Sequence, residues 1–331
     1  MIKAGMVGSG VFAGEYMKAA RYIRSAYHVE LRIQAACNRT EESNLRAREL
    51  YGIDSTYFEP REMIEREKPD CLFVLVPPDR MYETVLKLLP YRVPLLIEKP
   101  PGLTSAQTMH LAAEAERDGT SVMVGFNRRF YSVAKQAKKF VEDAGGLLGM
   151  RMDAFERYKI YKENKVLPDE QLEALFMTNS IHCIDLIRFY AGESTAVTSF
   201  SNAGAMGSFA HRYSSLVVSD RNVPVTFQAY WNSVGNWNYE LYFEDGKIQF
   251  VTLEEAYLHR RGEHPVKIEP QQDDIEAKPG LTRQLLYFME HVAPTMNYCG
   301  ELSLRDAART MRLAEQLTGT TIGGESHERI D

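Results

Sequence analysis

The chain has 331 residues, 44% of them hydrophobic and 25% charged, and its formal net charge is −6 at pH 7. This length exceeds the size at which one hydrophobic core usually keeps growing, so we expect two domains. The scattered negative charge argues against a nucleic-acid partner, and the lack of an apolar run of about 18 residues argues against a membrane span. We therefore expect a cytoplasmic protein with no membrane partner.

An apolar run, Ile2 to Val7, stops at a glycine-rich turn, and a helix-like pattern follows. Such a turn binds the pyrophosphate of a dinucleotide, because residues without a side chain let phosphates approach bare backbone amides at a helix N-terminus. The residues that we assign to the cofactor site are Gly8, Ser9, Gly10, Val11 and Phe12 in this turn, and further along the chain Asn38, Arg39, Thr40, Val76, Pro77, Glu98 and Lys99.

Strands and helices then alternate through residue 125. Strands are predicted at 29–37, 56–58, 71–76, 94–97 and 121–125, with helices at 11–26, 41–51, 60–67, after Pro77-Pro78 and at 104–118. This alternation predicts a right-handed, doubly wound parallel sheet, an α/β fold of the Rossmann type. Because parallel strands end at one edge, the polar breaks after them should share a ligand-binding edge. These breaks are at Gly8, Asn38, Val76-Pro77, Lys99 and Asn127.

From about residue 146 the pattern changes to strands that face one another. They are predicted at 150–155, 197–202, 214–219, 223–231, 239–243, 247–252 and 255–260, with helices near 178–191, 280–292 and 303–317. We expect an α+β domain with a large, mostly antiparallel open sheet. The predicted domains are residues 1–125, which bind the dinucleotide, and residues 126–331, which bind the substrate and form oligomers.

The second predicted strand ends at Asn38-Arg39-Thr40. A carboxylate at this point would hold the ribose hydroxyls of NAD and repel the 2′-phosphate of NADP. Because no carboxylate is present, the triplet favours NADP over NAD: Asn38 can bond a hydroxyl, and Arg39 offers its guanidinium to the phosphate. The alternative is that Arg39 is an exposed loop cation.

Two further residues have side chains suited to catalysis. Lys99, in Glu98-Lys99-Pro100, follows a parallel strand and can hold a substrate oxygen in the cleft; otherwise it is a surface lysine. His182 opens a predicted helix with Asp185 one turn on, where a carboxylate can orient an imidazole or bind a hydroxyl. The ordinary pKa of histidine, about 6.5, suits proton transfer at neutral pH, although a lone helical histidine is otherwise a core residue.

The segment 156–176 is rich in tyrosine and lysine. Its Tyr158 either contributes to substrate binding over the cleft or belongs to an exposed polar excursion. The four cysteines, which show no C-x-x-C pair, are expected to be buried reduced thiols, and no histidine spacing indicates a metal. The cysteines are Cys37, Cys71, Cys183 and Cys299.

Four motifs stand in order along the chain: Gly8-x-Gly10-x-x-Ala13, Glu98-Lys99-Pro100, Gly125 to Phe130 and Ser180 to Asp185. Together they resemble the glucose-fructose oxidoreductase and inositol dehydrogenase family, often called Gfo/Idh/MocA, over nearly the whole chain. The resemblance implies a catalytic lysine at Lys99, often followed by a cis peptide bond, and a proton-transferring histidine at His182. It places Asn127 and Arg128 beside the nicotinamide and the substrate, and it implies a homodimer or homotetramer formed through the second domain's sheet.

One position departs from that family. Its dehydrogenases usually carry an aspartate four residues before the histidine, and this chain has Thr178 there. Threonine donates a hydrogen bond but carries no charge, so the proton relay must use His182, Lys99 or a carboxylate from elsewhere such as Glu173. The loss of the negative charge favours a neutral ketone as ligand, and hence a reductase.

These observations predict an NAD(P)-dependent oxidoreductase that interconverts a secondary hydroxyl and a ketone on a sugar, cyclitol or related polyol. Two alternatives remain open. One is a dinucleotide-binding regulator or sensor without turnover. The other is a glycosidase or lyase that oxidises its substrate transiently with a tightly bound cofactor.

Overall fold

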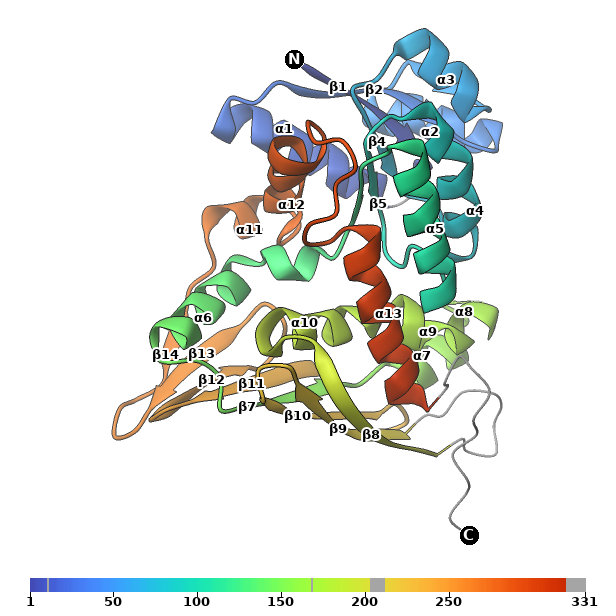
Figure 1. The fold of residues 1–331 in the computed structure, drawn as a ribbon. Helices are drawn as coiled ribbons and strands as arrows, with labels where there is room; N and C mark the ends of the chain where they lie inside the picture. Colours follow the sequence, from blue (N-terminus) through green and yellow to red (C-terminus); the bar gives the residue numbers. More distant parts are fainter. Residues whose placement is uncertain (11, 168, 203–211, 320–331) are drawn as a thin grey trace. The chain divides into compact units, whose positions relative to one another are not determined.

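The computed structural model describes residues 1–10, 12–167, 169–202 and 212–319 (Figure 1). The chain divides into two compact units. The first comprises Met1–Ser132 and Pro270–Ala308, and the second comprises Val133–Glu269 with the described residues from Arg309 onward. Within the described ranges, no helix is both long enough and apolar enough to cross a membrane.

The first unit contains a six-stranded sheet in the order β3-β2-β1-β4-β5-β6, with every neighbouring pair parallel. Its strands are β1 (Ile2–Val7), β2 (Leu31–Cys37), β3 (Ser55–Tyr57), β4 (Cys71–Val74), β5 (Leu95–Ile97) and β6 (Val122–Val124). β4 and β5 are buried along their whole length, as apolar strands covered on both faces must be. The predicted doubly wound sheet is confirmed, and its strand order reverses between β1 and β4, where such sheets bind ligands.

The strands are connected by α1 (Ala13–Tyr27), α2 (Glu41–Tyr51), α3 (Pro60–Glu67), α4 (Pro78–Leu88), η1 (Leu89–Tyr91) and α5 (Ser105–Asp118). After β6 the unit also contains η2 (Asn127–Phe130), α11 (Gln272–Glu276), α12 (Leu281–Tyr287) and η3 (Phe288–Val292). α2 and α3 have the predicted bounds. η3 is a π-helical turn that continues α12, so the predicted helix over 280–292 is present with a change of pitch.

The compact units differ from the predicted domains, because residues 270–308 pack with the first unit. The hydroxyl of Tyr27 on α1 donates to both carboxylate oxygens of Asp273, at 2.6 and 2.7 Å. Val124 at the end of β6 donates its backbone N–H to Leu302 at 2.8 Å. These contacts join residues far apart in the sequence, and no local pattern indicates them.

The second unit contains an eight-stranded sheet in the order β14-β13-β12-β11-β7-β10-β9-β8. Its strands are β7 (Gly149–Ala154), β8 (Ser194–Asn202), β9 (Arg212–Ser219), β10 (Pro224–Tyr230), β11 (Trp237–Phe243), β12 (Gly246–Phe250), β13 (Ala256–Arg260) and β14 (Val266–Ile268). The β7–β10 pair is parallel and the other pairs are antiparallel, so the mostly antiparallel sheet that we predicted is confirmed.

Helices of this unit lie on one side of the sheet, where α6 and α10 are visible (Figure 1). They are α6 (Ser132–Asp143), α7 (Tyr158–Glu163), α8 (Asp169–Glu173), α9 (Leu175–Thr178) and α10 (Ile181–Ala191), while α13 (Leu304–Thr318) contributes to both units. The predicted helix over 178–191 is interrupted: α9 ends at Thr178 and α10 begins at Ile181.

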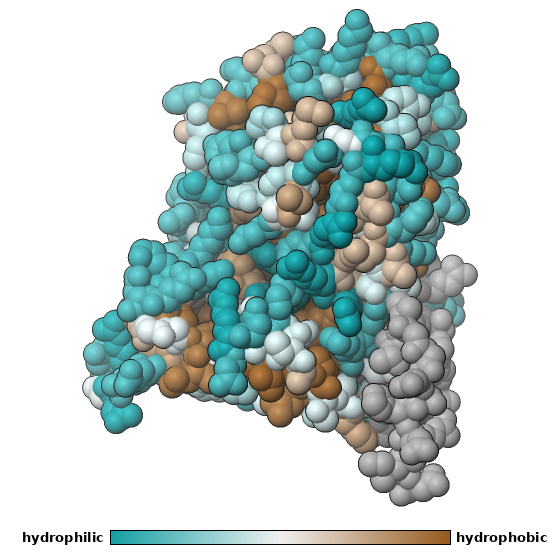
Figure 2. All heavy atoms as spheres, viewed as in Figure 1, coloured by the Kyte–Doolittle hydropathy of each residue, from teal (hydrophilic) through white to brown (hydrophobic). Residues whose placement is uncertain are grey.

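The other face of this sheet carries exposed apolar side chains. Along β9 and β10, buried residues alternate with more exposed ones, as expected for a sheet covered on one face. Phe200 and Leu216 are 68% and 47% exposed, and Figure 2 shows apolar residues gathered with polar ones over this part of the molecule.

All four cysteines are free thiols. Three of them are buried as predicted, and burial raises the pKa of the Cys37 and Cys71 thiols to about 12. Cys299 is exposed, so the expectation that it is buried was wrong. It lies in the turn before α13, where its short side chain is not covered by the core.

Candidate active site

The glycine turn between β1 and α1 begins with a residue that must be glycine. Gly8 has a φ of +88°, and a Cβ there would lie 2.9 Å from the carbonyl oxygen of Leu75 and 3.2 Å from a methyl of Val76. The backbone N–H of Gly8 donates to Cys37 at 2.9 Å. The turn therefore packs closely against the ends of β2 and β4, and only glycine fits at position 8.

The next glycine faces open space. A Cβ at Gly10 would meet no atom within 4 Å. Among the described residues, no group accepts the N–H of Gly10 or Phe12, and no side chain caps the start of α1. Exposed amides at the positive end of a helix fit a pyrophosphate. Val11, also assigned to this site, lies outside the described residues.

Asn38 and Ser9 hold the turn in place. Asn38 is buried, and its Oδ1 accepts the backbone N–H of Ser9 at 2.7 Å and the Ser9 hydroxyl at 3.0 Å. Its Nδ2 donates to Oδ1 of Asn44 on α2 at 3.1 Å. The Asn38 amide is thus directed at the protein, whereas the sequence suggested that it would bond a ribose hydroxyl.

The two residues after Asn38 are exposed. Thr40 caps α2, because its hydroxyl oxygen accepts the N–H of Ser43 at 3.2 Å. Arg39 forms no ion pair with any residue in the described part of the chain. Its guanidinium stands at the end of β2, where the ribose of a dinucleotide is read in Rossmann folds.

Glu98, after β5, points into the interior. It is half-buried, and its Oε1 accepts the hydroxyl of Tyr16 on α1 at 2.9 Å. Burial raises the pKa of Glu98, while the nearby charges of Lys99 and Arg128 act in the opposite direction. A Cβ at Gly125 would lie 3.3 Å from Glu98 Oε1, so glycine at the end of β6 makes room for this carboxyl group.

Lys99 and the η2 residues lie at the same edge of the sheet, after β5 and β6. Lys99 is half-buried and its peptide bond to Pro100 is cis, as the resemblance implied. Asn127 is buried and donates to the carbonyl of Pro279 at 3.0 Å. The guanidinium of Arg128 lies 4.9 Å from the ring centroid of Tyr131. Val76 and Pro77, after β4, complete the set predicted at this edge.

His182 lies in the second unit, in the first turn of α10. It is 5% exposed, and its ring centroid is 6.3 Å from that of Trp237 on β11. Asp185, one turn on, is fully buried and accepts the hydroxyl of Thr310 at 2.9 Å. The carboxylate that was expected to serve the imidazole or a substrate hydroxyl is therefore bonded to α13.

Thr178 closes α9 and donates its hydroxyl to the carbonyl of Ala174 at 2.9 Å. Tyr158 is buried and lies nearly parallel to Trp231, with ring centroids 6.2 Å apart, so this residue is not part of an exposed excursion. Nothing is described for the side chain of Glu173, the carboxylate suggested for the relay.

The sequence analysis did not identify several polar residues that lie near Glu98, near Phe12 or before α10. Tyr16 and Gln284 are fully buried near Glu98, and the ammonium of Lys278 lies 5.5 Å from the ring centroid of Phe12. Glu156 is buried before α10 and accepts hydrogen bonds from Asn179 and Ser180. The only signal in the sequence for Tyr16 and Gln284 was that each is a polar residue at a position where the helical periodicity predicts an apolar one.

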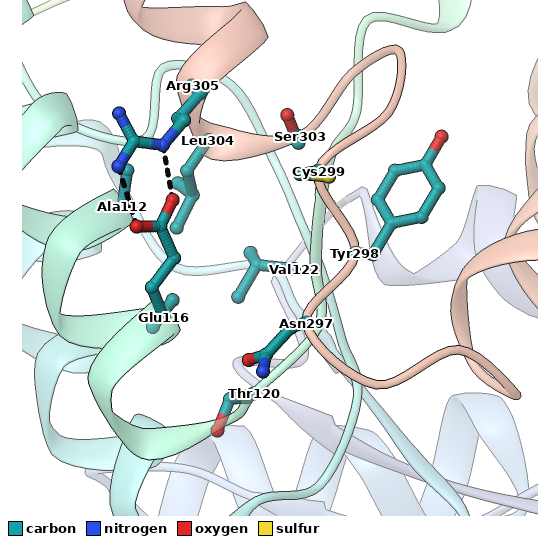
Figure 3. A pocket seen from close by; sticks show the side chains of 11 residues that line it. Ala112, Glu116, Thr120, Val122, Asn297, Tyr298, Cys299, Ser303, Leu304 and Arg305 are labelled. Carbon is teal, nitrogen blue, oxygen red and sulfur yellow. Dashed lines mark hydrogen bonds and ion pairs between the residues drawn. The ribbon is translucent and has the colours of Figure 1, made fainter.

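Figure 3 shows a small hollow in the first unit. It is lined by α5, the loop before α13 and Val122, the first residue of β6, which places it near the amino end of a strand. Glu116 and Arg305 form an ion pair at its side. Its volume of about 20 Å³ accommodates about one water molecule, so it fits neither a dinucleotide nor a sugar.

Residues 2–126 match the Gfo/Idh/MocA family model, described as an oxidoreductase family with an NAD-binding Rossmann fold. The chain is 26% identical over 212 residues to the rhizopine catabolism protein MocA of Rhizobium meliloti, covering 61% of this chain and 63% of that protein. It is 24% identical over 197 residues to myo-inositol 2-dehydrogenase of Thermotoga maritima, covering 58% and 55%. The matched region thus spans less than two thirds of either relative.

The fold has solved counterparts. A levoglucosan dehydrogenase in complex with NADH and levoglucosan superposes with a TM-score of 0.80 at 14% identity, covering 96% of each chain. This likeness concerns the fold, including the second unit's sheet. Residues 2–126 are therefore similar to the Gfo/Idh/MocA oxidoreductase family, whose model describes an NAD-binding Rossmann fold.

Proposed function

We propose that this protein is an NAD(P)-dependent oxidoreductase that interconverts a secondary hydroxyl and a ketone on a sugar, cyclitol or related polyol. The open backbone at Gly10, at the same sheet edge as Lys99, carries the proposal. The distant relationship to a myo-inositol dehydrogenase supports a polyol-like substrate.

The bound nicotinamide supplies the hydride acceptor or donor. In the proposed reaction, the ammonium of Lys99 stabilises negative charge that develops on the substrate oxygen. The imidazole of His182 takes the hydroxyl proton during oxidation and returns it during reduction. Asn127, Arg128, Thr178, Asp185 and Tyr158 are proposed as further substrate-binding residues.

We propose NADP as the preferred dinucleotide. The side chain of Asn38 is engaged with Ser9 and Asn44, and the residue after it is the exposed Arg39. A guanidinium at this place attracts a 2′-phosphate, which an acidic side chain would repel.

A homodimer or homotetramer that pairs the open face of the second unit's sheet is also proposed. Exposed Phe200 and Leu216 lie on neighbouring strands of that face. Covering them would remove apolar area from water. Light scattering after gel filtration measures the assembly, and a monomer at micromolar concentration would contradict it.

The reaction is tested with purified protein, NADP⁺ or NAD⁺ and a panel that includes myo-inositol and common aldoses, monitored at the absorbance of the reduced nicotinamide. We expect net reduction with at least one polyol or sugar. Lys99→Met should lower kcat by about 100-fold while dinucleotide binding is retained. Lys87→Met, an exposed lysine on α4, is the matched control and should leave turnover unchanged.

Near-normal turnover of Lys99→Met would refute the assigned role. A product formed without net change in absorbance would instead indicate transient oxidation by a retained cofactor. Dinucleotide binding without any product across the panel would favour a sensor.

A further inference from the structure

A buried carboxylate lies beside the helix that carries His182. Glu156, in the segment between β7 and α7, is 4% exposed. Its Oε1 accepts the hydroxyl of Ser180 at 2.6 Å, and its Oε2 accepts the side-chain amide of Asn179 at 2.8 Å. Burying a carboxylate is costly unless hydrogen bonds and a nearby positive charge compensate it.

The two residues that Glu156 holds also start α10. The backbone N–H of His182 donates to the carbonyl of Asn179 at 3.2 Å, and that of Cys183 donates to the carbonyl of Ser180 at 2.9 Å. The contact chain therefore runs from the carboxylate through Asn179 and Ser180 to the first turn of the helix. A change at Glu156 reaches His182 through two hydrogen-bonded neighbours.

Two features of His182 oppose the protonated imidazole. The side chain is buried, and it lies at the positive end of a helix. Burial and the helix dipole both lower the pKa of a histidine. A negative charge held close to the imidazole would offset both effects.

The other charged groups around α10 have partners of their own, among them Lys138, whose ammonium donates to the carbonyl of Phe189 in the last turn of α10. Asp185 is bonded to Thr310, and Arg188 is paired with Glu193. α9, which packs against α10, carries no ionisable side chain. On β7, which also packs against α10, Arg151 is paired with Asp153. The ionisable groups considered on β11 also have partners. Tyr239 is bonded to Tyr190, and Glu240 is bonded to Lys247 and Tyr242. On α10 itself, the remaining ionisable group is the thiol of Cys183.

We propose that Glu156 is a positioning residue for His182. It holds His182 at the start of α10 through Asn179 and Ser180, and its negative charge stabilises the protonated imidazole. The inference rests on the proposed role of His182. Glu156 thereby supplies the negative charge that Thr178, whose hydroxyl is bonded within its own helix turn, does not carry.

The pKa of His182 can be measured by NMR titration of the imidazole signals, with the signal assigned by its loss in His182→Asn. We expect a pKa within about 1 of the ordinary 6.5 in the unaltered protein and a decrease of about 1 in Glu156→Gln. The glutamine keeps an acceptor for Ser180 and removes the charge. Glu156→Asp, which keeps the charge, should retain most of the original pKa.

The matched control is Asp153→Asn, which neutralises another buried carboxylate, one that lies on β7 and is paired with Arg151. It should leave the His182 pKa unchanged. An unchanged pKa in Glu156→Gln overturns the inference, as does an equal decrease in the control. A His182 pKa below about 5.5 in the unaltered protein also overturns it, whichever variants fold.

Kinetics separate this inference from the proposed function. On a substrate found in the panel, Glu156→Gln should lower kcat/KM by about tenfold and shift its acidic limb to lower pH, with an unchanged KM for the dinucleotide. In a His182→Asn background the same change should have no further effect. A full additional loss there overturns the inference alone, whereas normal turnover of His182→Asn overturns the assigned role of His182.

Discussion

Oδ1 of Asn38 accepts two hydrogen bonds from Ser9, one from the backbone N–H at 2.7 Å and one from the hydroxyl at 3.0 Å. The end of β2 is thereby tied to the glycine turn after β1. The side chain that was expected to bind the ribose holds the glycine turn in place instead.

Replacing Asn38 with alanine should therefore weaken both folding and dinucleotide binding. The change leaves the buried backbone N–H of Ser9 without its acceptor, while the Ser9 hydroxyl keeps the carbonyl of Ser43, and the loss costs about 1–3 kcal/mol of unfolding free energy. Urea denaturation and dinucleotide titration measure the two effects. Arg39→Ala, at the next and exposed position, should change the stability by less than about 0.5 kcal/mol. Equal stability of both variants would contradict the structural role of Asn38.

The two glycines of the turn should respond differently to alanine. At Gly10 a methyl group meets no protein atom within 4 Å, so we expect a nearly unchanged melting temperature. The methyl would occupy the space that a pyrophosphate needs, so the dinucleotide Kd should rise at least about tenfold. Gly8→Ala should lose stability as well, because its φ is +88° and the Leu75 carbonyl is too close. Unimpaired binding by Gly10→Ala would place the pyrophosphate elsewhere.

Arg39 should control the choice between the two dinucleotides. Arg39→Ala removes the guanidinium proposed to pair with the 2′-phosphate, so the Kd for NADP⁺ should rise by about 10-fold or more while that for NAD⁺ stays nearly the same. The control is Arg46→Ala, an arginine of α2 that is paired with Glu42. Titration calorimetry with both dinucleotides measures the ratio. A preference for NAD⁺ in the unaltered protein would refute the NADP proposal.

Glu98 should make folding stability depend on pH. Burial raises its pKa above 4.5, so the folded state binds the proton more tightly than the unfolded chain does. Its contribution is fully present below about pH 4.5 and is lost as the pH rises through the folded-state pKa. Glu98→Gln keeps an acceptor for Tyr16 and cannot ionise, so its stability relative to the unaltered protein should increase as the pH rises.

Urea denaturation between pH 4 and 8 measures this difference. Glu83→Gln, an exposed glutamate of α4, is the control and should follow the curve of the unaltered protein. A constant difference between Glu98→Gln and the unaltered protein over that range would show that the Glu98 carboxyl group has the same pKa in both states.

The sequence by itself determined the local chemistry of the first unit. Three local features carried the prediction. They are an apolar run that stops at Gly8, short apolar runs that alternate with segments of helical periodicity, and a lysine that follows a strand. Such patterns operate over a few residues, so they predicted the parallel sheet and the edge shared by Gly8, Asn38 and Lys99. They also predicted the mostly antiparallel second sheet, from its alternating strands and turns.

The tertiary structure decided the partners of the polar side chains. It directs Asn38 to Ser9, Glu98 to Tyr16, and Glu156 to the two residues before α10, and it packs residues 270–308 with the first unit. Each of these contacts joins residues from 23 to more than 200 positions apart. The periodicity of a sequence shows which face of a helix or strand is buried. It does not show which group bonds a buried polar atom, because that partner comes from a distant element and depends on how the elements pack.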